Sequence, residues 1–164
     1  MNITPIPAFS DNYIWMIVHK DRAAVVDPGD PTPVLKTLEE QGVVLDTIII
    51  THHHFDHTGG VGALKSATGC RVIGPDNPKI ADIDETMTEG AQVTVLGYGF
   101  EVMEVPGHTL DHIAYYSAED GTLFCGDTLF VGGCGRVFEG TFPMMQQSLA
   151  KLSDLPSETK VYCT

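Results

Sequence analysis

The sequence predicts an α/β protein whose strands and helices pack in layers. Short apolar runs rich in β-branched residues alternate with amphipathic segments, and no repeat or low-complexity tract interrupts them. The first two predicted strands form a hairpin and the later ones are mixed with helices, a pattern that favours a layered sandwich. Polar clusters follow directly after several predicted strands, which is where α/β folds place their chemistry. At 164 residues, the chain is expected to form one domain, residues 1–164.

The predicted strands are short and apolar. Residues 13–18 are aromatic and β-branched, which indicates a buried strand, and residues 23–26 are its hairpin partner across a turn at 19–22. Residues 47–50 end in three isoleucines, which predicts a central strand buried on both faces. The remaining strands are expected at residues 71–73, 91–95, 100–105, 113–117, 122–125 and 160–162.

Three helices are predicted from the spacing of apolar residues. They are expected at residues 32–41, with Pro33 in the first turn and Gly42 as the stop, at 59–68 and at 144–152. The residues expected to face the core are Val34, Leu35 and Leu38 in the first helix and Val61, Leu64 and Ala67 in the second.

Composition excludes several classes of protein. An apolar fraction of 43% is ordinary for a globular domain, and no apolar run is long enough to cross a bilayer. The net charge of −13, from 9 basic and 22 acidic residues, argues against a nucleic-acid partner, whose phosphates are bound by Lys and Arg. The N-terminus lacks the basic and apolar regions of a signal peptide. The four cysteines match no metal or redox spacing, so we expect reduced, mostly buried thiols in a cytoplasmic protein.

The strongest functional signal is the segment T-H-H-H-F-D-H at residues 51–57. Imidazole nitrogen and carboxylate oxygen are the ligands that zinc and similar metals prefer. An extended backbone points His52 and His54 the same way, while Asp56 and His57 come from the following turn. Two such pairs can serve two adjacent metal ions. The alternative is an exposed polar loop, which the flanking apolar strand and helix disfavour.

Two further segments place single donors after strands. P-G-H-T at residues 106–109 presents His108, which is the natural third imidazole for the ion held by His52 and His54. G-D-T at 126–128 presents Asp127, which next to two cations is suited to bridge them with one oxygen each. Alone, such a His would be structural and such an Asp a turn former.

Taken in this order, the three segments resemble the metal motifs of the metallo-β-lactamase superfamily. The resemblance covers most of the chain and implies a four-layer αββα sandwich with mixed sheets. It also implies two divalent metal ions, with zinc as the default and iron or manganese as alternatives. Together with the ligand pattern, it makes Asp56 and Asp127 the candidate catalytic carboxylates. The full set of candidate metal ligands is His52, His54, Asp56, His57, His108 and Asp127.

A narrower resemblance is to the glyoxalase II family of hydroxyacylglutathione hydrolases. It rests on I-P-A-F-S-D-N-Y at residues 6–13 and on G-G-C-G-R-V-F-E-G-T at residues 132–141. By this similarity Arg136 and Phe138 would contact the glutathione moiety, with Phe138 where many members have Tyr. The alternative for Arg136 is a surface ion pair. Relative to that family the chain lacks a final metal-ligating His and a helical domain, so we expect a truncated catalytic domain or a short form.

Three other residues near these motifs have open roles. Asp27 either supports the site or caps its Pro-Gly turn, and His112 either orients a ligand or is an ordinary core residue. His53 points away from its neighbours and is expected to bind no metal.

The resemblance implies a thioester hydrolase that converts S-D-lactoylglutathione to D-lactate and glutathione in methylglyoxal detoxification. The expected partner is this small molecule, with no nucleic acid and no membrane, and the expected state is a monomer. The alternatives are a persulfide dioxygenase or another thioester hydrolase of the same fold, or a metal-binding fragment with little activity.

Overall fold

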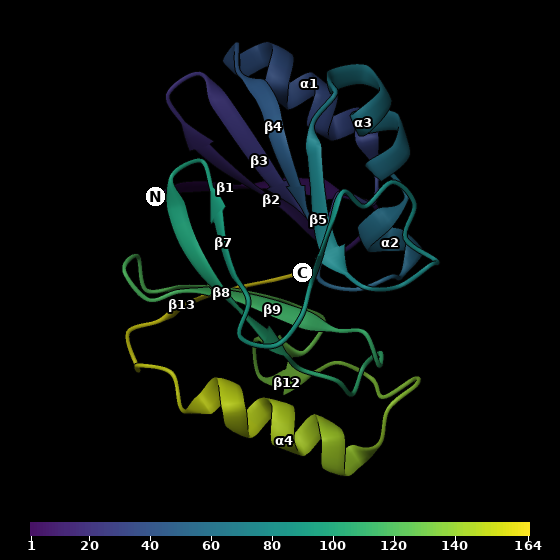
Figure 1. Ribbon diagram of the computed structural model, residues 1–164, viewed down its shortest axis with the longest axis vertical. Helices are drawn as coiled ribbons and strands as arrows, with labels where there is room; N and C mark the ends of the chain where they lie inside the picture. Colours follow the sequence, from purple (N-terminus) through teal and green to yellow (C-terminus); the bar gives the residue numbers. More distant parts are fainter.

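Two β-sheets pack face to face with helices on both outer sides (Figure 1). The computed structural model describes all of residues 1–164. Helices α1 and α3 cover the first sheet and helix α4 covers the second, so the order of layers is αββα. This confirms the predicted four-layer sandwich with mixed sheets. No helix is both long and apolar enough to cross a membrane.

The first sheet contains six strands in sequence order. Strands β1, β2 and β3 pair antiparallel, whereas β3 to β6 pair parallel. Their bounds are β1 Asn2–Ala8, β2 Asn12–His19, β3 Arg22–Val26, β4 Val44–Ile49, β5 Arg71–Pro75 and β6 Glu85–Met87. As predicted, β4 lies inside the sheet, and β2 and β3 form the hairpin.

The second sheet has the order β13-β10-β9-β8-β7 and is antiparallel except for the β10–β13 pair. Its strands are β7 Gln92–Val95, β8 Tyr98–Glu104, β9 Ile113–Ser117, β10 Thr122–Gly126 and β13 Lys160–Cys163. A small ribbon, β11 Leu129–Phe130 with β12 Gly133–Cys134, follows β10.

Each long helix has an identifiable start. Asp30 caps α1 (Pro31–Gln41) through a 2.8 Å hydrogen bond from the Thr32 amide, and Thr141 caps α4 (Phe142–Ser153) in the same way. Gly42 ends α1 in the left-handed conformation, as predicted. The short helix α2 (Phe55–Thr58) precedes α3 (Val61–Thr68).

Three apolar cores lie between the four layers. Because side chains alternate along a strand, Ile48 packs toward α1 and α3 whereas Ile49 packs toward the second sheet. In the same way Phe124 of β10 faces the first sheet, and Leu123 joins the core beneath α4. The continuous apolar runs in the sequence are therefore strands buried on both faces.

Strand β1 was not expected, because it contains Pro5 and Pro7, which cannot donate to a ladder. It is an edge strand that pairs only with β2. The two prolines are two residues apart, so both nitrogens point away from that single partner and no ladder hydrogen bond is lost. Strand β6 was also missed, because three residues are too few to show a period.

The second predicted helix differs from the structure at its start. Residues 59–68 were expected as one helix, but α3 begins at Val61, and the break falls where Gly60 packs against the turn that follows β3. The Gly60 amide donates to the carbonyl of Pro28 at 2.9 Å. A side chain at residue 60 would collide with that carbonyl and with the Pro31 nitrogen, so the chain turns there.

Two predicted core residues are exposed. Leu35 is 38% exposed and Ala67 is also at the surface, whereas Val34, Leu38, Val61 and Leu64 are buried. At about 100° per residue, Leu35 lies a quarter-turn from Val34 and Ala67 lies about 120° from Val61. Each helix therefore buries a narrower face than the sequence suggested. The cysteine expectation is half right, because Cys70 and Cys125 are buried but Cys134 is exposed.

Candidate metal centre

Four strand ends deliver polar residues to one end of the sandwich. Asp27 follows β3, the His52–His57 segment follows β4, His108 follows β8, and Asp127 follows β10. The first two come from one sheet and the last two from the other. The site therefore forms only when the two sheets pack.

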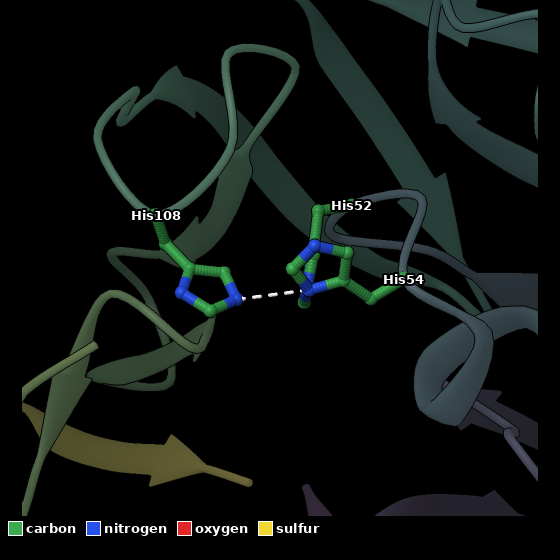
Figure 2. Close-up of side chains that lie close together, drawn as sticks. All are labelled: His52, His54 and His108. Atoms are coloured by element: carbon green, nitrogen blue, oxygen red, sulfur yellow. Dashed lines mark hydrogen bonds between the residues drawn. The ribbon is translucent and has the colours of Figure 1, made fainter. Parts of the chain in front are cut away.

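His52, His54 and His108 face a common centre, as Figure 2 shows. His54 Nδ1 lies 3.2 Å from His52 Nε2 and 3.0 Å from His108 Nε2. Two nitrogens bound tetrahedrally to one zinc ion at about 2.0–2.1 Å would lie roughly 3.3 Å apart. The spacing of the three nitrogens therefore fits a single ion.

A second group of donors surrounds His57. Its Nε2 lies 3.4 Å from Asp56 Oδ2 and 3.3 Å from Asp127 Oδ1. The other oxygen of Asp127 lies 3.4 Å from Nε2 of His108, in the first group. Asp127 thus presents one oxygen to each group, which is the arrangement expected of a bridging carboxylate.

The outer nitrogens of the imidazoles are held by the protein. Asp27 Oδ2 accepts hydrogen bonds from His57 Nδ1 at 3.1 Å and from the Thr51 hydroxyl at 2.6 Å. The same hydroxyl lies 3.0 Å from His52 Nδ1, and the carbonyl of Arg136 accepts from His108 Nδ1 at 2.7 Å. With Nδ1–H donated outward, His52, His57 and His108 each leave Nε2 free to bind a metal.

The backbone of Asp27 has a strained conformation. It is buried and has a φ of +54°, in the left-handed region that non-glycine residues rarely adopt. Its Oδ1 also accepts the Thr51 amide at 2.7 Å. The support role left open by the sequence is therefore the one that the contacts favour.

His112 is fully buried and stacks on His52 with ring centroids 4.6 Å apart. Its Nε2 accepts the backbone amide of Asp127 at 3.1 Å, which fixes the loop that carries the bridging carboxylate. Burial, together with the neighbouring His108 and His57, lowers the pKa of His112 to about 3, so the ring is a neutral acceptor. His112 therefore orients Asp127 through its backbone.

The pKa values of the clustered side chains are shifted in directions that favour binding of a cation. Burial, and then the surrounding histidines, lower the pKa of His52. Burial also acts on His57, but the nearby carboxylates of Asp127 and Asp27 outweigh it and raise the pKa of His57 well above its usual value. In return, His57 holds the pKa of Asp127 below its usual value despite burial. These carboxylates, which favour a proton on His57, equally favour a divalent cation there.

The donor set fits two divalent ions. His57 Nε2 and Asp127 Oδ1 are buried without a hydrogen-bond partner, which would be costly unless they bind a ligand. Three imidazoles and the shared carboxylate suit one ion, and Asp56, His57 and the same carboxylate suit the other. Imidazole and carboxylate are common ligands of zinc, iron and manganese alike.

The mouth of the site is a small cleft of about 160 Å³. It is lined by Asp11, Asn12, Asp56, Asp127, Phe130 and Thr164. Asn12 donates to Asp56 Oδ2 at 3.0 Å, a contact that the sequence could not show because 44 residues separate the two.

Arg136 and Phe138 lie next to the histidine group. Phe138 is 59% exposed and meets the rings of His108 and His54 edge-on, at 5.3 and 5.6 Å between centroids. The Arg136 guanidinium lies 5.6 Å from the Phe138 ring centre. No carboxylate lies within ion-pair distance of Arg136, which removes the surface ion pair as an explanation for this residue.

The structure brings all six candidate ligands into the two donor groups. His53 lies outside both groups and contacts other residues. It packs against Asp111 and Lys79, on the far side of the loop. These contacts could not be predicted from the sequence, because their partners are 26 and 58 residues away.

Comparison with known proteins identifies the family. Residues 8–163 match the model of the metallo-beta-lactamase superfamily. Two similar curated proteins are the hydroxyacylglutathione hydrolases of Ectopseudomonas mendocina and Idiomarina loihiensis, at 56% and 52% identity over 100% and 99% of this chain. The chain spans 65% and 64% of the length of these two relatives.

Solved structures share the fold. The chain superposes on ETHE1 from Myxococcus xanthus with a TM-score of 0.88 and 31% identity, over 99% of this chain and 75% of that one. It superposes on the BLEG-1 B3 metallo-beta-lactamase with a TM-score of 0.90, over 99% of this chain and 90% of that one. The two sequences are 24% identical, so this likeness is one of fold alone. With the family model matching nearly the whole chain, this protein belongs to the metallo-β-lactamase superfamily.

Proposed function

We propose that this protein hydrolyses S-D-lactoylglutathione to D-lactate and glutathione with the help of two zinc ions. The observation that carries the proposal is the position of Asp127, one oxygen toward His57 and the other toward His108. Such a shared carboxylate is one way in which a two-metal hydrolase holds its ions close together. The names of relatives that are 52–56% identical over almost the whole chain support the substrate.

In this proposal His52, His54 and His108 hold one ion, Asp56 and His57 hold the other, and Asp127 serves both. When bound, the two ions supply a water activated for attack at neutral pH and polarise the thioester carbonyl. Addition of the water oxygen to the acyl carbon is followed by cleavage of the C–S bond. The glutathione leaves as a thiolate, whose conjugate acid has a pKa of about 8.5, so a strong general acid is not required.

Asp56 is the carboxylate that orients the attacking water. Asn12 and His57 both lie against Oδ2 of Asp56, and the residue lines the cleft. The neighbouring His57 outweighs burial and holds the pKa of Asp56 far below its usual value. Asp56 therefore stays ionised and accepts a hydrogen bond from water without first losing a proton.

Arg136 and Phe138 bind the glutathione part of the substrate. The protein carries a charge of −13, yet an unpaired guanidinium lies near the ring of Phe138, which contacts His54 and His108. A carboxylate of the tripeptide can pair with Arg136 through two parallel hydrogen bonds. Phe138 offers an exposed ring for the apolar part of the peptide.

The proposal also includes the metal, the oligomeric state and the location: the protein binds zinc, is a monomer and lies in the cytoplasm. Zinc is the default metal for a histidine-rich site, and the four unpaired cysteines suit a reducing compartment. The acidic surface supports the expectation of no nucleic-acid partner.

The test combines metal analysis with a thioesterase assay. Protein purified with zinc should contain two ions per chain and release glutathione from S-D-lactoylglutathione, and Asp127→Asn should lose both properties. One ion or none, or two ions without thioester cleavage, would contradict the proposal. Oxygen uptake with a glutathione persulfide and an iron-loaded site would point to a dioxygenase instead, and opening of nitrocefin would point to a β-lactamase.

A further inference from the structure

A second polar cluster lies behind the metal centre, where four loops meet around His53. We call its members the His53 network; they are Asn77, Lys79, His53, Asp111 and Glu139. The loops concerned follow β4, β5, β8 and β12. None of these residues has a place in the two donor groups.

At the buried end of the network, Asp111 is bound from two sides. His53 Nδ1 lies 2.9 Å from Asp111 Oδ1, and the Asn77 side-chain amide donates to Oδ2 at 2.8 Å. The side chains of His53 and Asp111 are only 8% and 9% exposed. This end ties the loop of His52 and His54 to the loop of His108.

At the outer end, Glu139 is bound through both oxygens. Its Oε2 accepts a hydrogen bond from the backbone amide of Leu110 at 3.1 Å, and its Oε1 accepts one from Lys79 Nζ at 3.4 Å. Lys79 Nζ also lies 3.1 Å from His53 Nε2. His53 Nε2 lies 3.4 Å from the same Oε1, so Lys79, His53 and Glu139 form one compact polar group.

Glu139 belongs to the segment that carries the proposed substrate contacts. We call residues 135–140 the substrate loop. Its backbone lies along the His108 loop, through amides of Phe138 and Gly140 that donate to the carbonyls of His108 and Gly107 at 3.1 and 3.2 Å. The side chain of Glu139 adds a charge-assisted bond from the substrate loop to the Leu110 amide.

We propose that Glu139 is a positioning residue that holds Arg136 and Phe138 in place for the tripeptide, and so favours glutathione thioesters over thioesters that lack it. The inference rests on the proposed function. Gly135 and Gly140 lie in the substrate loop and Gly132 and Gly133 shortly before it, and such a glycine-rich segment is costly to order. Glu139 provides this ordering before the substrate arrives, which is how a fixed side chain improves binding.

The contacts that Glu139 makes with Lys79 and with the Leu110 amide are unequal in strength. Lys79 is 62% exposed, and an exposed ion pair changes an equilibrium by about five-fold at most. The bond to the Leu110 amide involves a charged acceptor, and its loss is expected to change an equilibrium by roughly ten-fold or more. Glutamine at residue 139 keeps an oxygen for this amide, whereas alanine does not.

The experiment compares Glu139→Ala, Glu139→Gln and a control, Glu119→Ala, which removes an exposed carboxylate without a hydrogen-bond partner. Each zinc-loaded protein is assayed with S-D-lactoylglutathione and with a lactoyl thioester of N-acetylcysteamine. For Glu139→Ala we expect KM for the glutathione thioester to rise about ten-fold, with kcat and the small thioester changed less than two-fold. Glu139→Gln should restore most of this loss, and the control should match the parent.

Amide hydrogen exchange gives a readout that needs no substrate. In Glu139→Ala the amides of Leu110 and Phe138 should exchange faster than in the parent, with the zinc content unchanged. If the parent cleaves no thioester while these amides still lose protection, the proposed function fails and the ordering role stands. Equal loss on both thioesters, or unchanged exchange and KM, would overturn the inference.

Discussion

Asp27 shows how a single residue can prepare a metal site. Its carboxylate accepts three hydrogen bonds, from the Thr51 amide, the Thr51 hydroxyl and His57 Nδ1. Through these contacts it determines which nitrogen His57 presents and, by way of Thr51, which nitrogen His52 presents. The strained φ of +54° is thus tied to the chemistry of two candidate ligands.

Replacing Asp27 by alanine should destabilise the metal-free protein by about 3 kcal/mol, because buried donors of Thr51 and His57 lose their acceptor. Urea unfolding monitored by circular dichroism measures this change. Asp21→Ala, at an exposed residue without side-chain partners, is the matched control and should fall within about 0.5 kcal/mol of the parent. Equal stability of the two variants would contradict the role given to Asp27.

The thiols should differ widely in reactivity. Burial raises the pKa of Cys125 to about 12 and also raises the pKa of Cys70, so neither forms the reactive thiolate near neutral pH. Cys134 is exposed and should react first with a thiol reagent, Cys163 more slowly, and the other two only after unfolding. Mass spectrometry of labelled protein at pH 7.5 tests this order, and Cys134→Ser should remove the fast phase.

At the scale of elements, the strands end where backbone segments from different elements come into close contact. Gly135, just after β12, packs against the carbonyl of Asp127 and lies near the His108 ring. A Cβ at residue 135 would overlap that carbonyl oxygen. The glycine therefore allows the substrate loop to approach the metal centre, a requirement that is invisible in the sequence.

Gly135→Ala should consequently displace Asp127 and destabilise the protein by about 1–3 kcal/mol. Gly133→Ala is a control in the same segment, because a Cβ there meets nothing within 4 Å. We expect the first variant to lose zinc affinity, measured by competition with a chromophoric chelator, and the second to keep it. Similar zinc affinities in both variants would show that the close contact is unimportant.

At the scale of the whole molecule, the metal centre joins the two sheets. His52, His54, Asp56 and His57 come from the first sheet, whereas His108 and Asp127 come from the second. Ions that bind both sets stabilise only the folded arrangement.

Zinc should therefore raise the melting temperature. Free zinc at a hundred times its dissociation constant adds about 2.7 kcal/mol, which for a domain of this size is roughly 5–10 °C. Calorimetry with zinc and with a chelator measures the shift, and Asp127→Asn should show a smaller one. A melting temperature that is indifferent to zinc would mean that the donors do not bind it in the folded state.

Much of the fold could be predicted because its strands carry a local signature. The run that ends in Ile48, Ile49 and Ile50 is apolar on both faces, so it had to lie between two layers. Strand β1 and the exposure of Leu35 could not be predicted in this way. Pairing at an edge and the width of a buried helix face depend on the neighbouring element and not on the segment itself.

The sequence by itself determined the kinds of donor and the strand ends that carry them, because side-chain type and alternation are local properties. Only the tertiary structure decided that Asp127 faces both groups, that Asp27 orients His57 and that Glu139 meets Leu110. Those contacts join residues far apart in the chain. They exist because two twisted sheets pack with a particular offset, and this offset is set by the sum of many core contacts rather than by any one motif.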